Sequence, residues 1–141
     1  MSELTHNITD IARCAAQYRT EELAPLGLKA CHGSYLSVIC ACPGITQDQL
    51  TQLLGFDKSS AARHAAFLEE NGYLTRQAGA DKRLLLLRPT EKTLVLEPEL
   101  TRQMNLWEQT LLQDLSPEEQ QTLLTLLSRV RSRAEQEEKH G

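Results

Sequence analysis

The stretch from residue 46 to residue 73 reads TQDQLTQLLGFDKSSAARHAAFLEENGY, and it contains the start and stop signals of two short helices. Thr46 and the glutamine three residues later form a capping-box pattern, in which each side chain satisfies a free backbone amide. Gly55 is placed to end the first helix in a left-handed conformation. Asp57 offers a capping carboxylate for a second helix over about 58–71. Two helices joined by a tight Gly-Phe-Asp turn are typical of a helix-turn-helix.

A β-hairpin is predicted directly after the second helix. Residues 73–76 (YLTR) and 84–87 (LLLL) are short runs that are compatible with extended backbone. The polar run 77–83 (QAGADKR) between them contains a glycine and ends on two adjacent cations. The sequence therefore predicts two strands that carry a basic loop at their turn.

The segments on both sides of this region are predicted to be helical. Apolar residues at spacings of three and four mark a helix over about 4–24, and a second helix over about 29–41 precedes a Pro-Gly turn signal. Helical periodicity resumes after the hairpin, where Pro98 either starts a helix or kinks a longer one. A last helix begins at a Ser-Pro-Glu-Glu capping box, and its charged tail from Glu135 is expected to fray.

The composition favours a helical protein that does not enter a membrane. Apolar residues make up 40% of the 141 residues but aromatic residues only 4%, so the core must consist mostly of Leu and Ala. No apolar run approaches the roughly 18 residues needed to span a bilayer, and the first seven residues lack the layout of a signal peptide. We therefore expect a cytoplasmic protein whose four cysteines are reduced.

The charge is unevenly distributed along the chain. The formal net charge is −4, which by itself disfavours nucleic acid as a partner. Residues 57–92, however, contain seven Lys or Arg and five Asp or Glu, so that this segment carries +2 and the remainder −6. Because DNA affinity depends on local cations that displace phosphate counterions, the basic segment remains compatible with DNA binding.

The order of these elements and several short motifs resemble the MarR family of winged helix-turn-helix regulators across nearly the whole chain. The resemblance extends over the entry to the first helix, the recognition helix, the wing and the junctions of the C-terminal helices. The matching runs are Pro43-Gly44-Ile45-Thr46-Gln47 with Leu50, Asp57-Lys58-Ser59-Ser60 with Arg63, Leu68-Glu69-Glu70-Asn71-Gly72-Tyr73-Leu74, Asp81-Lys82-Arg83, Thr90-Glu91-Lys92 and Leu115-Ser116-Pro117-Glu118-Glu119. Each run alone is a weak signal, and their order and spacing together indicate the family.

The resemblance implies a mainly α fold with a small β-hairpin wing. Residues 1–141 are expected to form a single domain, with a winged helix-turn-helix over about 29–89 and dimerisation helices over about 1–24 and 98–137. The terminal helices also carry more apolar surface than a small helix-turn-helix core needs, which favours a symmetric homodimer. A dimer places two recognition helices about one DNA turn apart and predicts a pseudo-palindromic operator.

The second helix of the pair is expected to enter the major groove of double-stranded DNA. Arg63 is the main candidate for a base contact, since its planar fork suits guanine O6 and N7. The alternative is that Arg63 merely pairs with Glu70 or with solvent. Further candidate contacts are polar or basic residues on the two helices and on the hairpin. These are Thr46, Gln47, Lys58, Ser59, Ser60, His64, Arg76 and Lys82.

Arg83, at the tip of the hairpin, resembles the arginine with which the family's wing reads the minor groove. A narrow A·T-rich groove concentrates negative potential and attracts such a side chain. Asp81 is expected to orient the loop by pairing with a nearby arginine, because a carboxylate would be repelled by DNA. The alternative is an ordinary solvated turn.

One group of residues is a candidate site for a regulatory small molecule. In the family, a small molecule or an oxidant often acts near the junction of the dimerisation and DNA-binding regions. Candidate pocket residues are Tyr18, Tyr35, Met104 and Trp107, and plain core packing is the favoured alternative for each.

The cysteines give only weak functional signals. Cys40 and Cys42 form a Cys-x-Cys pair that is a candidate redox sensor, although burial as small apolar residues is the commoner fate of free cysteine. No metal site is predicted, because such a site normally needs about four ligands and no second chelating pair is visible.

The remaining patterns disfavour an enzyme. The sequence contains no Ser/His/Asp set, no Gly-rich phosphate loop and no HExxH helix, and no cofactor is expected. The sequence therefore predicts a DNA-binding transcriptional regulator, of repressor type, that is relieved by a small-molecule effector or by cysteine oxidation. The alternative is a protein-interaction module that keeps the winged-helix fold without binding an operator, and the negative charge outside the helix-turn-helix favours it.

Overall fold

The computed structural model describes the backbone of residues Ser2–His140. The chain divides into two compact units, one ending at Thr101 and one beginning at Arg102. The boundary lies inside α5 (Glu91–Leu111), so this helix contributes to both units. Among the described helices, none has the length and apolar character that crossing a membrane would require.

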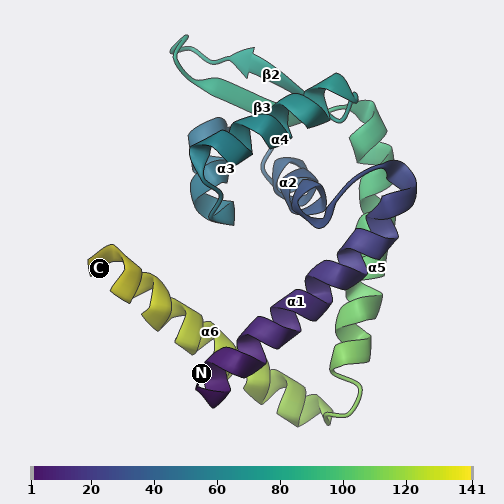
Figure 1. Ribbon diagram of the computed structural model, residues 1–141, viewed down its shortest axis with the longest axis vertical. Coiled ribbons are helices and arrows are strands. Elements are labelled where there is room, and N and C mark those ends of the chain that lie inside the picture. Colours follow the sequence, from purple (N-terminus) through teal and green to yellow (C-terminus); the bar gives the residue numbers. More distant parts are fainter. Residues whose placement is uncertain (1, 141) are drawn as a thin grey trace. The chain divides into compact units, whose positions relative to one another are not determined.

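The α-helices and the hairpin of the first unit follow the order predicted from the sequence, and a short 3₁₀ helix and a two-residue strand are present in addition (Figure 1). The helix pair and the hairpin are those of a winged helix-turn-helix. In chain order the elements are α1 (Glu3–Leu23), the short 3₁₀ helix η1 (Ala24–Leu26), α2 (Ala30–Ala41), β1 (Ile45–Thr46), α3 (Gln47–Leu54), α4 (Lys58–Glu70), β2 (Leu74–Ala78), β3 (Leu85–Pro89) and α5. The second unit contains the end of α5 and α6 (Pro117–His140).

The predicted helix signals of the α3–α4 pair are all present. The Thr46 hydroxyl accepts from the Gln49 backbone amide at 3.1 Å, and the Gln49 side chain accepts from the Thr46 amide at 3.1 Å. Gly55 ends α3 at φ +72°, in the left-handed region that glycine enters without the steric cost of a Cβ atom. Asp57 accepts from the Ser60 amide at 2.8 Å and so caps the first turn of α4.

The sheet has one strand more than the sequence predicts. In the described residues, β2 and β3 form the antiparallel hairpin, and the two-residue β1 pairs with the outer side of β3 through Ile45 opposite Leu87. The strands also extend two residues further than expected, to Ala78 and Pro89. A strand of two residues is too short to show an alternation of apolar and polar positions, so the sequence contains no signal for β1.

The core of the first unit is apolar and is built mainly from leucine. Aromatic residues contribute only Tyr35 and Tyr73 to its fully buried part within the described chain. The helices and strands that surround it therefore depend on aliphatic burial, which stabilises by roughly 25 cal/mol per Å² of apolar surface. The buried residues are Leu23, Leu28, Tyr35, Leu36, Ile39, Leu50, Ala65, Leu68, Tyr73, Leu74, Leu87 and Leu100.

Two predictions about the last helices are resolved. Pro98 lies inside α5, so it does not start a helix; the longer helix begins at Glu91. The prediction that the tail frays from Glu135 is wrong for the backbone, because α6 continues to His140. Arg131 and Arg133 face Glu135 and Glu137 one turn later at 3.8 and 3.4 Å, and such pairs support an exposed helix.

Candidate nucleic-acid interface

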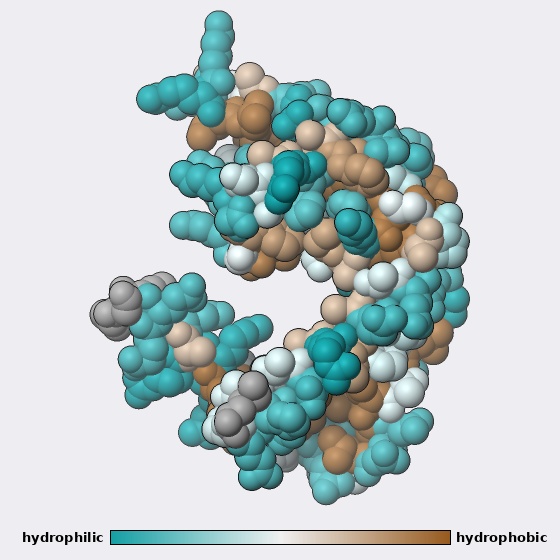
Figure 2. Space-filling view, viewed as in Figure 1, coloured by the Kyte–Doolittle hydropathy of each residue, from teal (hydrophilic) through white to brown (hydrophobic). Residues whose placement is uncertain are grey.

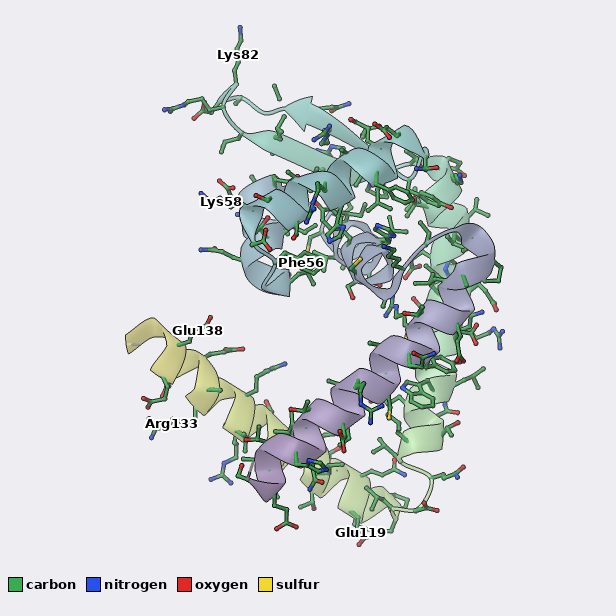
Figure 3. All side chains as sticks on the ribbon, viewed as in Figure 1. Phe56, Lys58, Lys82, Glu119, Arg133 and Glu138 are labelled. Atoms are coloured by element: carbon green, nitrogen blue, oxygen red, sulfur yellow. The ribbon has the colours of Figure 1, made fainter. Side chains whose placement is uncertain are left out.

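The first two turns of α4 present polar and basic side chains to solvent. Lys58, Ser59 and Arg63 are all exposed, and the side chain of Lys58 points away from the protein (Figure 3). The opposite face of the helix is buried through Ala61, Ala65 and Leu68, as the sequence predicts. α4 therefore has one face fixed in the core and one face free to meet a ligand.

Arg63 is linked to the helix cap through Ser60. Its Nη2 donates to Ser60 Oγ at 3.0 Å, and this hydroxyl donates in turn to Asp57 Oδ2 at 2.9 Å. The two hydrogen bonds to Ser60 lower the pKa of Asp57, and nearby Arg63 lowers it further. Glu70, the alternative partner considered for Arg63, makes no ion pair with it among the contacts found in the described residues.

The wing carries two exposed cations at its turn. Lys82 extends outward from the tip of the β2–β3 hairpin (Figure 3). Arg83 is paired with Asp81 by two side-chain hydrogen bonds, Nε to Oδ1 at 3.1 Å and Nη2 to Oδ2 at 3.0 Å. The Arg83 amide also donates to Asp81 Oδ1 at 3.0 Å, so the carboxylate holds both the main chain and the side chain of the arginine. These bonds lower the pKa of Asp81.

Hydrophilic side chains cover the end of the hairpin, and apolar side chains lie behind them (Figure 2). Leu84, which precedes β3, and Leu85, which begins it, are 41% and 40% exposed. The turn of the hairpin therefore combines exposed charge with partly exposed apolar side chains.

Two of the predicted DNA contacts have side chains that are engaged elsewhere. The Gln47 amide donates to Tyr35 Oη at 2.9 Å, so this side chain faces the core, although its backbone amide stays in the first turn of α3. Arg76 donates to Glu69 Oε1 at 3.2 Å from Nε and at 2.8 Å from Nη2. This pairing raises the pKa of Arg76 and lowers that of Glu69.

His64 faces α2 and is not directed outward with Arg63. Its Nδ1 lies 4.0 Å from Cys31 Sγ, and its ring meets His32 edge-on with 5.4 Å between ring centroids. Burial lowers the pKa of His64 below its usual value, and Arg63 and Lys29 lower it further. The sequence did not predict this cluster, because Cys31-His32 and His64 are more than thirty residues apart and no motif joins them.

The four residues considered for an effector pocket are divided between the two units. Tyr35 is completely buried in the core of the first unit, where burial raises the pKa of its hydroxyl. Tyr18 is half-buried on α1, and Met104 and Trp107 are half-buried in the second unit. The pocket itself stays a prediction.

The two candidate redox cysteines differ in their surroundings. Cys40 is half-buried, and burial together with Glu97 raises the pKa of its thiol, which lowers the fraction of reactive thiolate. Cys42 is exposed at the end of α2, beside an open hollow lined by Pro43, Ile45 and Leu53. All four cysteines are free thiols in this structure.

The capped helix pair, the buried face of α4 and the basic hairpin together define a winged helix-turn-helix, which is a class of DNA-binding fold. The family model described as MarR family matches residues 26–84. The HTH-type transcriptional regulator YybA of Bacillus subtilis is 30% identical over 138 residues, which cover 97% of this chain and 92% of that protein. This chain belongs to the MarR family of transcriptional regulators.

Solved structures agree with this assignment. The transcriptional regulator SlyA is 30% identical and superposes with a TM-score of 0.91, with 96% of each chain covered. A SlyA-like transcription regulator from Listeria monocytogenes is 29% identical, with a TM-score of 0.90 and coverage of 95% of this chain and 90% of that chain. The similarity therefore includes the helices at both ends as well as the winged helix-turn-helix.

Proposed function

We propose that this protein is a sequence-specific transcriptional regulator that binds double-stranded DNA as a homodimer and represses transcription. The observation that carries the proposal is the exposed face of α4, where Arg63 stands beside Lys58 and Ser59 on a helix whose other face is fixed in the core. Family membership supports DNA binding and disfavours an enzyme. A regulator of genomic DNA would act in the cytoplasm.

The helices and the wing have distinct roles in the proposed interface. Arg63 reads a guanine in the major groove, and Lys58 with Ser59 positions the helix on the phosphates. Arg83 enters the adjoining minor groove once DNA competes with Asp81 for its guanidinium. Thr46 and the backbone amide of Gln47 lie at the start of α3, where a helix N-terminus can meet a phosphate.

The homodimer is supported by apolar side chains that a single chain leaves exposed. On α1, Leu4 is 56%, Ile8 44% and Ile11 56% exposed. On α6, the apolar residues between Leu124 and Val130 are 42–48% exposed. Exposed apolar rows on long helices at both ends of a chain are typical of subunit interfaces.

We extend the proposal to induction by a small molecule or by oxidation. Between the two candidate thiols, Cys42 is the more suitable sensor because it is exposed, whereas the raised pKa of Cys40 disfavours its thiolate. Oxidant treatment of the wild type and of Cys42→Ser, followed by an operator-binding assay, tests the redox branch. Loss of binding in the wild type alone supports it; equal behaviour of both proteins contradicts it.

Genomic footprinting with purified protein tests the main proposal. Wild type is expected to protect a pseudo-palindromic site, and Arg63→Ala should lose about 1–3 kcal/mol of binding together with the preference at one base pair. Lys82→Ala is the matched control. Loss of a phosphate contact should weaken binding to all DNA sequences alike and reduce the dependence of log affinity on log salt concentration by about 1. Arg83→Ala should lose its preference for A·T pairs. If the wild type protects nothing at low salt, reduced or oxidised, a protein-interaction module becomes the better explanation.

A further inference from the structure

A cysteine and two histidines meet between α2 and α4. The donor atoms of Cys31, His32 and His64 all lie within 4.8 Å of one another, and Cys31 Sγ is 4.0 Å from His64 Nδ1. His32 is only 5% exposed, and the other two residues are half-buried. The cluster is therefore partly buried, with Cys31 and His64 keeping some exposure to solvent.

Aromatic neighbours hold both imidazoles in place. His32 stacks on Phe67 with 4.5 Å between ring centroids and 8° between ring planes. Phe56, which lies on the side of the α3–α4 turn that faces α2 (Figure 3), meets the His64 ring at 5.2 Å. Side chains restricted in this way lose less conformational freedom when they bind a ligand together.

We propose that Cys31, His32 and His64 bind one Zn²⁺ ion, with water as the fourth ligand. One thiolate and two imidazoles are a donor set that zinc prefers, at about 2.3 Å for sulfur and about 2.0–2.1 Å for nitrogen. Tetrahedral coordination at these bond lengths places neighbouring donors roughly 3.5 Å apart, so the present cluster needs a contraction of about 1 Å. A Zn–S bond forms as the S–H bond of Cys31 breaks, and the proton passes to solvent.

The donor atoms of the cluster suit a thiolate-binding ion better than a hard cation. Burial lowers the pKa of both histidines, and Lys29 lowers both further. His64 also lowers the pKa of His32, and Arg63 lowers that of His64, which Asp57 raises. A hard cation such as Mg²⁺ depends on carboxylate ligands, which the cluster lacks among the described residues. Zinc gains its affinity from the bonds to sulfur and nitrogen.

Zinc competes with a hydrogen bond at the start of α2. The backbone amide of Lys29 donates to Nδ1 of His32 at 3.0 Å. If zinc binds Nδ1, it takes the lone pair that accepts this bond; if it binds Nε2, the ring proton must move to Nδ1. In either case the Lys29 amide loses its hydrogen-bond acceptor on the imidazole. A water molecule can accept this hydrogen bond instead, because Lys29 is exposed.

The site is adjacent in sequence to the proposed base-reading residue. His64 directly follows Arg63, so a metal that draws His64 toward α2 acts on the helical turn that carries Arg63. Zinc and operator DNA would then change each other's affinity by the same factor. This consequence rests on the proposed function, whereas the metal site does not.

Titration of the reduced, metal-free protein with Co²⁺ tests the site without DNA. We expect one equivalent per chain, with a near-ultraviolet thiolate charge-transfer band and the visible bands of tetrahedral Co²⁺, both removed by Zn²⁺. Cys31→Ser should abolish the charge-transfer band, and His64→Asn should weaken binding at least tenfold. The Cys40→Ser/Cys42→Ser protein is the matched control and should bind as the wild type does, while circular dichroism confirms that each variant is folded.

Three results would overturn the proposal. These are the absence of a charge-transfer band in the wild type, its persistence in folded Cys31→Ser, and its loss in the Cys40→Ser/Cys42→Ser control, which would assign the metal to the Cys-x-Cys pair. Because none of them involves DNA, failure of the metal site remains distinct from failure of operator binding.

Discussion

Arg76 on β2 and Glu69 on α4 form an ion pair in which both Nε and Nη2 donate to Oε1, at 3.2 and 2.8 Å. The Arg76 backbone amide donates to the second carboxylate oxygen at 3.3 Å, so one glutamate holds the strand to the helix through three hydrogen bonds. The two side chains are 28% and 39% exposed. The pair joins α4 to the wing within the first unit.

Replacing Arg76 is expected to affect stability more than DNA affinity. Arg76→Ala should lower the free energy of unfolding by about 0.5–1 kcal/mol, the range for a pair that solvent partly screens. Urea unfolding measures this loss, and Arg88→Ala, an exposed arginine on the neighbouring strand, is the control and should change little. A variant that keeps its stability but loses operator affinity would show that Arg76 contacts phosphate after all.

The contribution of this pair should depend on pH. Arg76 lowers the pKa of Glu69, so its stabilising effect is complete above the ordinary Glu pKa of about 4.3 and is lost as the pH falls through the folded-state value. The stability difference between wild type and Glu69→Gln should therefore be larger at pH 7 than at about pH 3. Equal differences at the two pH values would mean that the charge of Glu69 is not what matters.

Asp57 is expected to matter for α4 through its cap. Asp57→Ala removes the acceptor for the Ser60 amide and the partner of the Ser60 hydroxyl, so the first turn of α4 should fray and Arg63 should lose its anchor. Thermal unfolding should show a lower Tm, and operator affinity should fall with it. Asn is also a good N-cap, so Asp57→Asn should restore most of the stability. If Asn fails where Asp succeeds, the charge rather than the cap is the important property.

Most of the fold could be predicted because its signals are local. The Thr46 capping box, Gly55 and the Asp57 cap each specify a boundary through side-chain chemistry within a few residues, and all three are present in the structure. β1 could not be predicted, because its two residues acquire their conformation from pairing with β3. Boundaries set by tertiary contacts leave no periodic trace in the sequence.

The candidate site, like the fold, could be predicted where its signals are local and not where they depend on packing between helices. The exposure of Arg63 follows from helical spacing relative to Ala61, Ala65 and Leu68, which the sequence displays. The inward direction of Gln47 and of His64 depends on Tyr35 and Cys31, which belong to a different helix. Spacing along one helix assigns a face, but the partners on that face come from packing between helices.

Gly55 is expected to stabilise the turn between α3 and α4 through its left-handed conformation. An alanine Cβ would meet nothing within 4 Å there, so the cost of Gly55→Ala comes from the positive φ alone and should be about 1–2 kcal/mol. Gly79→Ala is the control, since that glycine has no positive φ and a Cβ would lie 3.4 Å from the Leu86 side chain. Chemical unfolding of both variants measures the difference, and similar losses would show that the left-handed geometry is not the limiting factor.

The exposed apolar row of α6 is expected to hold the proposed dimer together. Leu124 and Leu127 are one turn apart and are 45% and 42% exposed in the single chain. Introducing glutamate at both positions places charges in an apolar interface, where their desolvation is uncompensated, so the protein should become monomeric in sedimentation equilibrium. Leu53→Glu, which alters a leucine of α3 that is 65% exposed, should leave the oligomeric state unchanged.

Because a monomer presents only one recognition helix, the double variant should also lose affinity for a palindromic site while keeping weak, salt-dependent binding to a half-site. A folded double variant that sediments as a dimer would place the subunit interface outside this row.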